Sequence, residues 1–332
     1  MTDLRRALLS ASGLLLFSLV LSLCLGVQSY SIGTVFAALT SAEQETVDAL
    51  VIWSSRVPRT LVALAVGAGL GMAGAMLQTL TRNILADPGL LGINAGAAFG
   101  VVLLVAVTAT PPSLSTLALA SIIGALVTGA LVYILAGGAA GIGKDSLRLI
   151  LAGAVMALAL GSLMHILLLL EPGAFEATQL WLAGSIADRP GDMLPFFLPG
   201  IGLALVAGLI LSPMLSVLML DATQAASLGA NIMRTRVFTL LVASVLCGLS
   251  VSLAGPLAFV GLLAPHLARG QVGPRPVALF PLATLFGASL VLLADILARM
   301  VIAPAELPIG VILAAMGVPV YILLLTRRRK FA

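Results

Sequence analysis

The sequence predicts an all-α, polytopic membrane protein with about ten transmembrane helices, and three observations support this fold class. The composition is 61% hydrophobic and 9% charged, with a mean hydropathy of +1.19, whereas soluble domains contain about 25% charged residues. Apolar blocks of about 20 residues, long enough to cross a bilayer core as a helix, recur along the whole chain. Stretches such as 122–135 lack the alternation of a membrane β-strand. We therefore expect one transmembrane domain over residues 1–332.

Apolar runs between charged or Pro/Gly-rich breaks define the candidate spans. The first run follows Arg5 and Arg6 and is longer than the usual apolar core of a signal peptide, so it is expected to be a span. The eighth run holds Pro256 and Pro265 and predicts a short, broken helix. The runs cover residues 7–27, 60–80, 91–109, 114–136, 147–170, 193–212, 237–254, 257–268, 277–298 and 307–326.

The basic residues are divided unequally between the loops on the two sides of these spans. If the N-terminus is cytoplasmic, only Arg56, Arg59, Arg189 and Arg299 fall on the outer face. The positive-inside rule then predicts that both termini are cytoplasmic, as in a multi-pass inner-membrane protein, and the basic balance needs no nucleic-acid partner. The inner face holds Arg5, Arg6, Arg82, Lys144, Arg148, Arg234, Arg236, Arg269, Arg275, Arg327, Arg328, Arg329 and Lys330.

Two glycine motifs resemble nucleotide-binding sequences without their context. Residues 69–74 fit GxGxxG but lie within a span, where Gly67, Gly71 and Ala75 share a helix face suited to close packing. Residues 138–144 approach the Walker A pattern, but Asp145 stands where the magnesium-binding hydroxyl belongs. We expect no cofactor, and any ATP chemistry must come from a partner.

The remaining polar residues do not predict a catalytic or metal site. His165 and His266 are about a hundred residues apart and have no ligand pattern near them; we interpret His165 as a packed, hydrogen-bonded histidine. Cys24 and Cys247 lie in apolar blocks, as buried hydrophobic residues do. A nucleophile–base constellation is absent from the sequence pattern, so an enzyme is disfavoured.

Arginines on the outer face could instead form a docking site. Arg299 is four residues after Asp295, so the two either pair with each other or leave Arg299 available at the surface. Arg56 and Arg59 either contact lipid headgroups or receive carboxylates from a soluble partner, for which guanidinium groups are well suited.

The cytoplasmic loop 221–236 carries two sets of helix-capping signals. Asp221 with Gln224 could begin a short helix that ends at Gly229, and Asn231 could cap the next helix. Such ordered ends indicate a docking surface for a soluble protein, and a plain connector is the alternative.

Six segments together resemble the FecCD family of ABC-importer permeases, which serves ferric siderophores, haem and cobalamin. The resemblance covers nearly the whole chain and implies ten helices per subunit in the type II importer fold. The segments are RVPR at 56–59, AGAMLQTLTRNILADPGLLGINAGA at 73–97, SLGAN at 227–231, AGPLAFVGLLAPHLAR at 254–269, GASLVLLADILAR at 287–299 and ELPIG at 306–310.

The resemblance also implies partners: a second permease subunit, two cytoplasmic ATPase subunits and a periplasmic substrate-binding protein, with membrane lipid around them. It implies that Arg56, Arg59 and Arg299 receive acidic side chains of the binding protein. It places Asn83 and Leu85 in the cytoplasmic gate, although Ile84 replaces the family's usual proline there. The coupling loop seated on the ATPase would include Asp221, Gln224, Ala225, Leu228, Gly229, Asn231 and Arg234.

The cargo implied first is a ferric siderophore, with cobalamin and haem as alternatives. An ion-coupled secondary transporter is less favoured, because Asp87, Asp295 and Glu306 lie at span ends rather than at the bilayer midplane.

Overall fold

The computed structural model describes residues 2–40, 46–108, 112–138, 146–187, 191, 194–219 and 231–328, and helices dominate these ranges. No strand occurs within them, which confirms the all-α prediction. The helices are α1 (Thr2–Cys24), α2 (Ile32–Thr40), α3 (Val47–Val51), η1 (Ile52–Arg56), α4 (Val57–Thr81), α5 (Ile93–Val107), α6 (Leu114–Leu135), α8 (Ser146–Leu170), α9 (Pro172–Leu182), α10 (Leu194–Leu218), α12 (Ile232–Ala254), α13 (Val260–Val272), α14 (Pro276–Met300) and α15 (Ile309–Arg328).

Each candidate span coincides with one of these helices. In the described part of the chain, 7 helices are long and apolar enough to cross a membrane. The apolar segments of α5 and α15 are shorter, and α13 has 13 residues. Helix length and composition therefore confirm a multi-pass membrane protein, while the predicted number of ten crossings stays a prediction.

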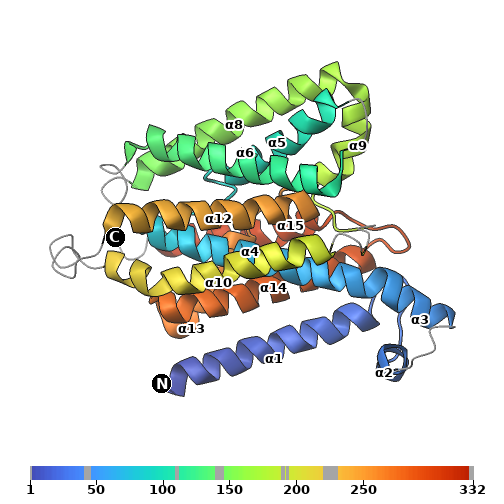
Figure 1. The fold of residues 1–332 in the computed structure, drawn as a ribbon. Coiled ribbons are helices and arrows are strands. Elements are labelled where there is room, and N and C mark those ends of the chain that lie inside the picture. The colour runs from blue at the N-terminus through green and yellow to red at the C-terminus, as the bar shows by residue number, and fades with distance from the viewer. Residues whose placement is uncertain are drawn as a thin grey trace.

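Helix α4 is the centre of the bundle, and its first turn corrects a predicted boundary. It packs against α10, α12, α13 and α14, and nearly all of its side chains are buried. Figure 1 shows α4 lying between these helices. The span was predicted to begin at residue 60, but α3, η1 and α4 form one continuous helix from Val47 to Thr81. The predicted span started only after Arg56 and Arg59, because charged residues normally mark the end of a span. In the structure both side chains have partners inside the fold.

Glycine lets the backbones of α4 and α14 approach closely. A Cβ atom built on Gly287 would lie 2.2 Å from the carbonyl oxygen of Gly67, and one on Gly71 would lie 2.3 Å from that of Ala283. Small residues at helix contacts are typical of membrane proteins, where dispersion rather than the hydrophobic effect holds helices together. The GxGxxG segment is therefore a packing surface, as the sequence predicted.

The predicted break before the eighth span occurs between α12 and α13. Helix α12 ends at Ala254, Gly255 has a φ of 74°, and Phe259 precedes α13 with a φ of 68°. The Asn94 amide donates a hydrogen bond of 2.9 Å to the carbonyl oxygen of Leu257 within this irregular stretch. Protein groups thus bind the freed backbone, as a discontinuous helix in a membrane requires.

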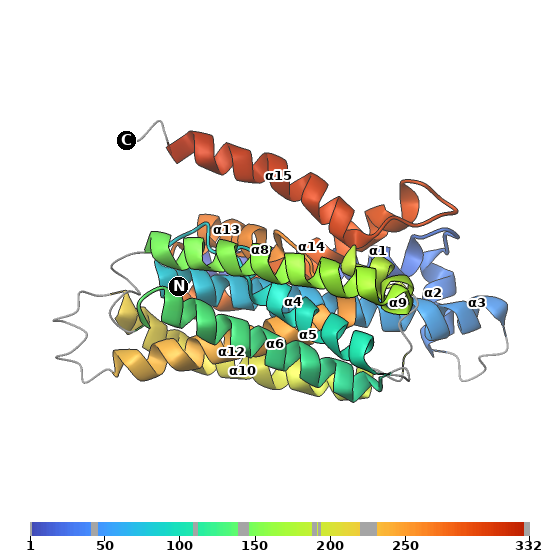
Figure 2. The ribbon, with the colours of Figure 1, turned by 90° about the horizontal axis from the view of Figure 1, so that it is seen from above.

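The helix ends gather at two opposite ends of the molecule. In Figure 1 the N-terminus of α1 and the C-terminus of α4 lie at the left, while α2 and α3 lie at the right. Helix α15 starts beside the bundle and runs away from it toward the C-terminus (Figure 2). Ile309, Leu313 and Gly317 are the buried residues in the described part of this helix, so most of α15 presents an apolar surface.

Candidate functional site

Three arginines expected to dock a partner come together at one end of the bundle. Arg56 ends η1, Arg59 lies in the first turn of α4, and Arg299 lies in the last turn of α14. A Cβ atom on Gly26, just after α1, would lie 3.1 Å from Arg56 Nη2 and 3.3 Å from Arg299 Nη1. Residues far apart in the sequence therefore build a single cationic cluster.

Arg59 is held on both edges of its guanidinium group. Its Nε donates to Asp295 Oδ1 at 2.9 Å, and its Nη2 lies 2.9 Å from the same oxygen. Its Nη1 donates to Glu306 at 3.1 Å (Oε1) and 2.8 Å (Oε2). The Asp295 side chain is 0% exposed and that of Glu306 is 30% exposed, so the inner pair is buried and the outer pair faces the surface.

Arg299 and Arg56 bind the C-terminal end of α1. Arg299 Nη1 donates to the carbonyl oxygens of Ser22 (3.3 Å) and Leu25 (3.0 Å). Arg56 donates to the carbonyl oxygens of Leu23 (2.7 Å) and Gln28, and its Cζ lies 4.6 Å from the ring centre of Tyr30. The last carbonyl groups of a helix lack partners within it and favour positive charge, so these arginines cap α1.

Asp295 joins the two halves of the cluster. Its Oδ2 lies 3.0 Å from Arg299 Nη2, so of the two alternatives left open by the sequence the structure shows the i,i+4 pair. This contact lacks hydrogen-bond geometry, so its strength comes from charge attraction at short range. Removing one partner of a buried ion pair typically costs about 3–5 kcal/mol, whereas an exposed pair contributes about 0.2–1 kcal/mol. The Asp295 pairs are therefore structural, and the Arg59–Glu306 pair is the one that can exchange.

The cluster leaves one positive charge unbalanced, since three arginines meet two carboxylates. Arg56 and Arg299 are 6% and 4% exposed, so the surface available to a partner is chiefly that of Arg59 and its neighbours. The sequence did not predict this burial. Carbonyl oxygens of α1 have no side-chain identity, so they leave no sequence signal.

The predicted gate residues lie at the opposite end of α4. Arg82 ends the helix in a left-handed conformation with a φ of 51°. Asn83 Oδ1 accepts a hydrogen bond of 3.0 Å from the Leu85 amide, and the Asn83 carbonyl accepts one of 3.2 Å from the Ala86 amide. Local hydrogen bonds thus shape this turn, with Ile84 where the resemblance implies a proline. Ile84 faces a cavity of about 320 Å³ that Arg82 and Arg269 also line.

Asp87 follows the gate turn and is almost completely buried. Its Oδ1 accepts a hydrogen bond of 2.8 Å from the Gly89 amide. Burial raises the pKa of the Asp87 carboxyl to about 6, and the hydrogen bonds from the amides of Gly89 and Leu90 oppose part of this rise. Asp87 is therefore a group at this end whose charge changes near neutral pH.

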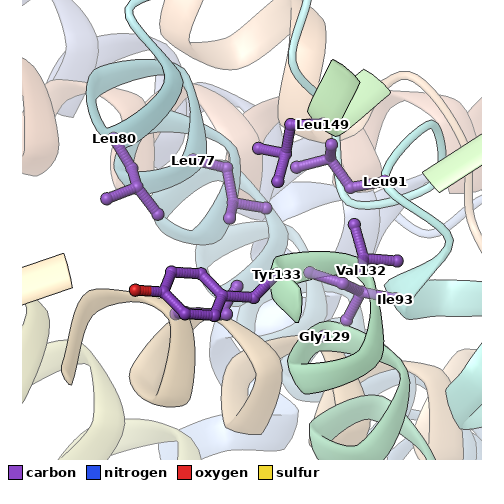
Figure 3. A pocket seen from close by; sticks show the side chains of 9 residues that line it. Leu77, Leu80, Leu91, Ile93, Gly129, Val132, Tyr133 and Leu149 are labelled. Carbon is purple, nitrogen blue, oxygen red and sulfur yellow. The ribbon is translucent and has the colours of Figure 1, made fainter. Parts of the chain in front are cut away.

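A second, smaller cavity beside the gate turn is apolar. It is lined by Leu77 and Leu80 of α4, Leu91, which precedes α5, Ile93 of α5 and Leu149 of α8. Residues of α6 and α12 complete the lining. Figure 3 shows the Tyr133 hydroxyl pointing away from Leu91 and Ile93. That hydroxyl donates to Met233 Sδ at 3.0 Å. The lining offers no acid, base or nucleophile that could act on a bound molecule.

The structure describes only the last part of the predicted coupling loop, from Asn231 onward. Asp221, Gln224, Ala225, Leu228 and Gly229 lie outside the described residues. Asn231 caps α12 as predicted, since its Oδ1 accepts a hydrogen bond of 3.0 Å from the Arg234 amide. Arg234 itself is exposed. The end of α10 lies at the gate end, because Arg82 after α4 binds the Leu218 carbonyl there. The start of α12 lies at the same end of the bundle (Figure 1).

The described residues contain no group of three or more His, Cys, Asp or Glu side chains that could hold a metal ion. His165 binds the carbonyl oxygen of Gly161 on its own helix at 2.7 Å, as predicted, but it is exposed rather than packed. Cys24 and Cys247 are free and buried, which confirms the sequence interpretation.

Comparison with known proteins finds a family and relatives that match almost the whole chain. The FecCD transport family matches residues 14–327. The ferric enterobactin transport system permease protein FepD of Escherichia coli (strain K12) is 39% identical over 96% of this chain and 94% of its own length. The hemin transport system permease protein HmuU of Yersinia pestis is 33% identical over 95% of each chain.

A solved structure shares the fold as well. It is described as an inward-facing conformation of a transporter assigned to the metal-chelate type of ABC transporter, and it matches with a TM-score of 0.83 and 31% identity. The match covers 97% of this chain and 99% of that one.

Proposed function

The chain belongs to the FecCD transport family, and from this premise we propose that it is the permease subunit of an ABC importer that moves an iron–siderophore-type chelate from periplasm to cytoplasm. The observation that supports this most strongly is the match of almost the whole chain to a metal-chelate type ABC transporter. Relatives named for ferric enterobactin, Fe(3+) dicitrate and hemin favour an iron chelate as cargo. Haem and cobalamin are the alternatives.

In this proposal the two ends of α4 serve different partners. The cluster of Arg56, Arg59 and Arg299 faces the periplasm, and Arg59, the arginine with an edge at the surface, receives an acidic group of a binding protein, since guanidinium groups match carboxylates in geometry and charge. The gate turn at Asn83 and Leu85 faces the cytoplasm. The loop around Leu228 transmits the closing of two ATPase subunits to a pair of permease subunits, which alternate between outward-open and inward-open states. Both termini are cytoplasmic.

This chain would do no covalent chemistry itself. The smaller cavity beside the gate turn is apolar, the larger one is also lined by Arg82 and Arg269, and neither holds a catalytic constellation in the described residues. A weakly interacting pathway lets a chelate leave as easily as it enters, so selectivity would reside in the binding protein. ATP hydrolysis would belong to the partner subunits.

Uptake in proteoliposomes tests the proposal. The chain is reconstituted with its ATPase and binding protein, and the accumulation of ferric siderophore, haem and cobalamin is measured with ATP or a non-hydrolysable analogue inside. We expect ATP-dependent accumulation of one ferric siderophore and none with the analogue. Accumulation that persists without ATP hydrolysis would instead support an ion-coupled transporter, and preference for haem or cobalamin would correct the cargo.

A further inference from the structure

Glu306 occupies the one edge of Arg59 that a partner could reach. It lies in the turn between α14 and α15, and its two carboxylate oxygens accept from Arg59 Nη1 at 3.1 and 2.8 Å. The Nε and Nη2 edge of the same guanidinium group is already fixed on the fully buried Asp295. A partner's carboxylate can therefore bind Arg59 only at the edge that Glu306 now occupies.

The turn keeps Glu306 in place beside Arg59. The amide of the next residue, Leu307, donates a hydrogen bond of 3.0 Å to the carbonyl oxygen of Ala298 in the last turns of α14. The backbone at Glu306 is thus tied to the helix that carries Asp295 and Arg299. A displaced Glu306 side chain would remain near the cluster and would repel an incoming carboxylate.

We propose that Glu306 is an intramolecular competitor for the acidic docking group: it binds Arg59 in the unoccupied transporter and must be displaced when a partner's carboxylate arrives. Exposed ion pairs are weak and exchange readily, whereas the buried Asp295 pairs are costly to break, so Glu306 is the carboxylate that exchanges. This inference rests on the proposed docking role of the cluster and adds to it a residue that sets partner affinity.

The proposed competition predicts whether removing the charge of Glu306 strengthens or weakens partner binding. Glutamine at position 306 keeps the size and hydrogen-bonding oxygen of the side chain but removes its charge, so Arg59 is held less tightly by its own chain. Given the usual strength of an exposed ion pair, the partner should bind about two- to fivefold more tightly to the Glu306→Gln variant. Raising the salt concentration should shrink this difference, because exposed charges are screened.

The experiment measures the dissociation constant of the purified cognate periplasmic binding protein on the permease–ATPase complex in lipid nanodiscs. Glu306→Gln is compared with the native chain and with Glu171→Gln, which alters another exposed glutamate before a helix, α9. We expect tighter binding for Glu306→Gln alone. A Glu306→Ala variant should shift affinity in the same direction, and thermal unfolding checks that these variants and Arg59→Gln are folded.

Arg59→Gln separates this inference from the docking proposal on which it rests. If Arg59→Gln weakens binding but Glu306→Gln leaves it unchanged or weaker, Glu306 is not a competitor and the inference is overturned. If Arg59→Gln has no effect on binding, the docking role of the cluster fails. With competition, Glu306→Gln should add nothing in the Arg59→Gln background.

Discussion

Single side chains at the two ends of α4 carry the charges on which the proposed mechanism depends. At the cluster end, Arg56 and Arg299 bind the carbonyl oxygens of α1, and only Arg59 has an edge facing the surface. A variant of Arg56 or Arg299 would therefore perturb α1 as well as any partner. Glu306 is the position at which docking can be tested with little effect on folding, whereas a variant of Arg59 also breaks the buried pair with Asp295.

Asp87 gives the gate end a pH dependence. Burial raises the pKa of its carboxyl from the ordinary 3.8 to about 6, so folding favours the protonated form. Its contribution to stability is complete below about pH 3.8 and is lost as the pH rises through about 6. At pH 7.5 the buried carboxylate lowers the free energy of unfolding by about 3 kcal/mol.

Asp87→Asn should therefore stabilise the purified chain at pH 7.5 and have little effect near pH 4. Asparagine retains an oxygen to accept the hydrogen bond from the Gly89 amide. Thermal unfolding in detergent, followed by tryptophan fluorescence at the two pH values, measures the shift. Asp48→Asn, at an exposed carboxylate, is the control. An equal rise at both pH values, or a fall at pH 7.5, would contradict the assignment.

Among the elements, the contact between α4 and α14 depends on glycine. A methyl group on Gly287 would lie 2.2 Å from the Gly67 carbonyl oxygen, a backbone atom that cannot move without its helix. Gly287→Ala should separate the helices and lower the free energy of unfolding by about 1–3 kcal/mol. Gly202→Ala in α10 is the matched control, because nothing lies within 4 Å of its added methyl group.

Of the two alanine variants, only Gly287→Ala should lower the thermal midpoint. Alanine is favoured over glycine inside a helix by about 1 kcal/mol, so Gly202→Ala should be neutral or stabilising. Equal midpoints for the two variants would show that α4 and α14 can relax, and would contradict the close packing described above.

Hydropathy predicted the helices well because each apolar run corresponds to one element, from α1 to α15. It failed at the start of α4, where Arg56 and Arg59 interrupt the apolar run although the helix continues through them. The i,i+4 pair of Asp295 and Arg299 was predictable because it is local. Glu306 was not predicted as a partner of Arg59, since 247 residues separate the two in the sequence.

At the scale of the whole molecule, one end carries the cluster with Glu306 and the other carries most of the described basic residues on helix ends. Helix α14 joins the two ends: Arg275 precedes it and Ala305 follows it, and both positions are exposed. A helix of 25 residues is about 37 Å long, which exceeds the hydrocarbon thickness of about 30 Å. The two positions should therefore lie on opposite sides of the membrane.

Cysteine labelling can show which side is which. Cys24 and Cys247 are buried, so the native chain should react slowly with a membrane-impermeant maleimide and serves as the control. In spheroplasts we expect rapid labelling of Ala305→Cys and none of Arg275→Cys, with the reverse in inverted vesicles. Labelling of Arg275→Cys from outside would place the arginine cluster beside the ATPase, where it could not receive a periplasmic partner, and the proposed import mechanism would be untenable.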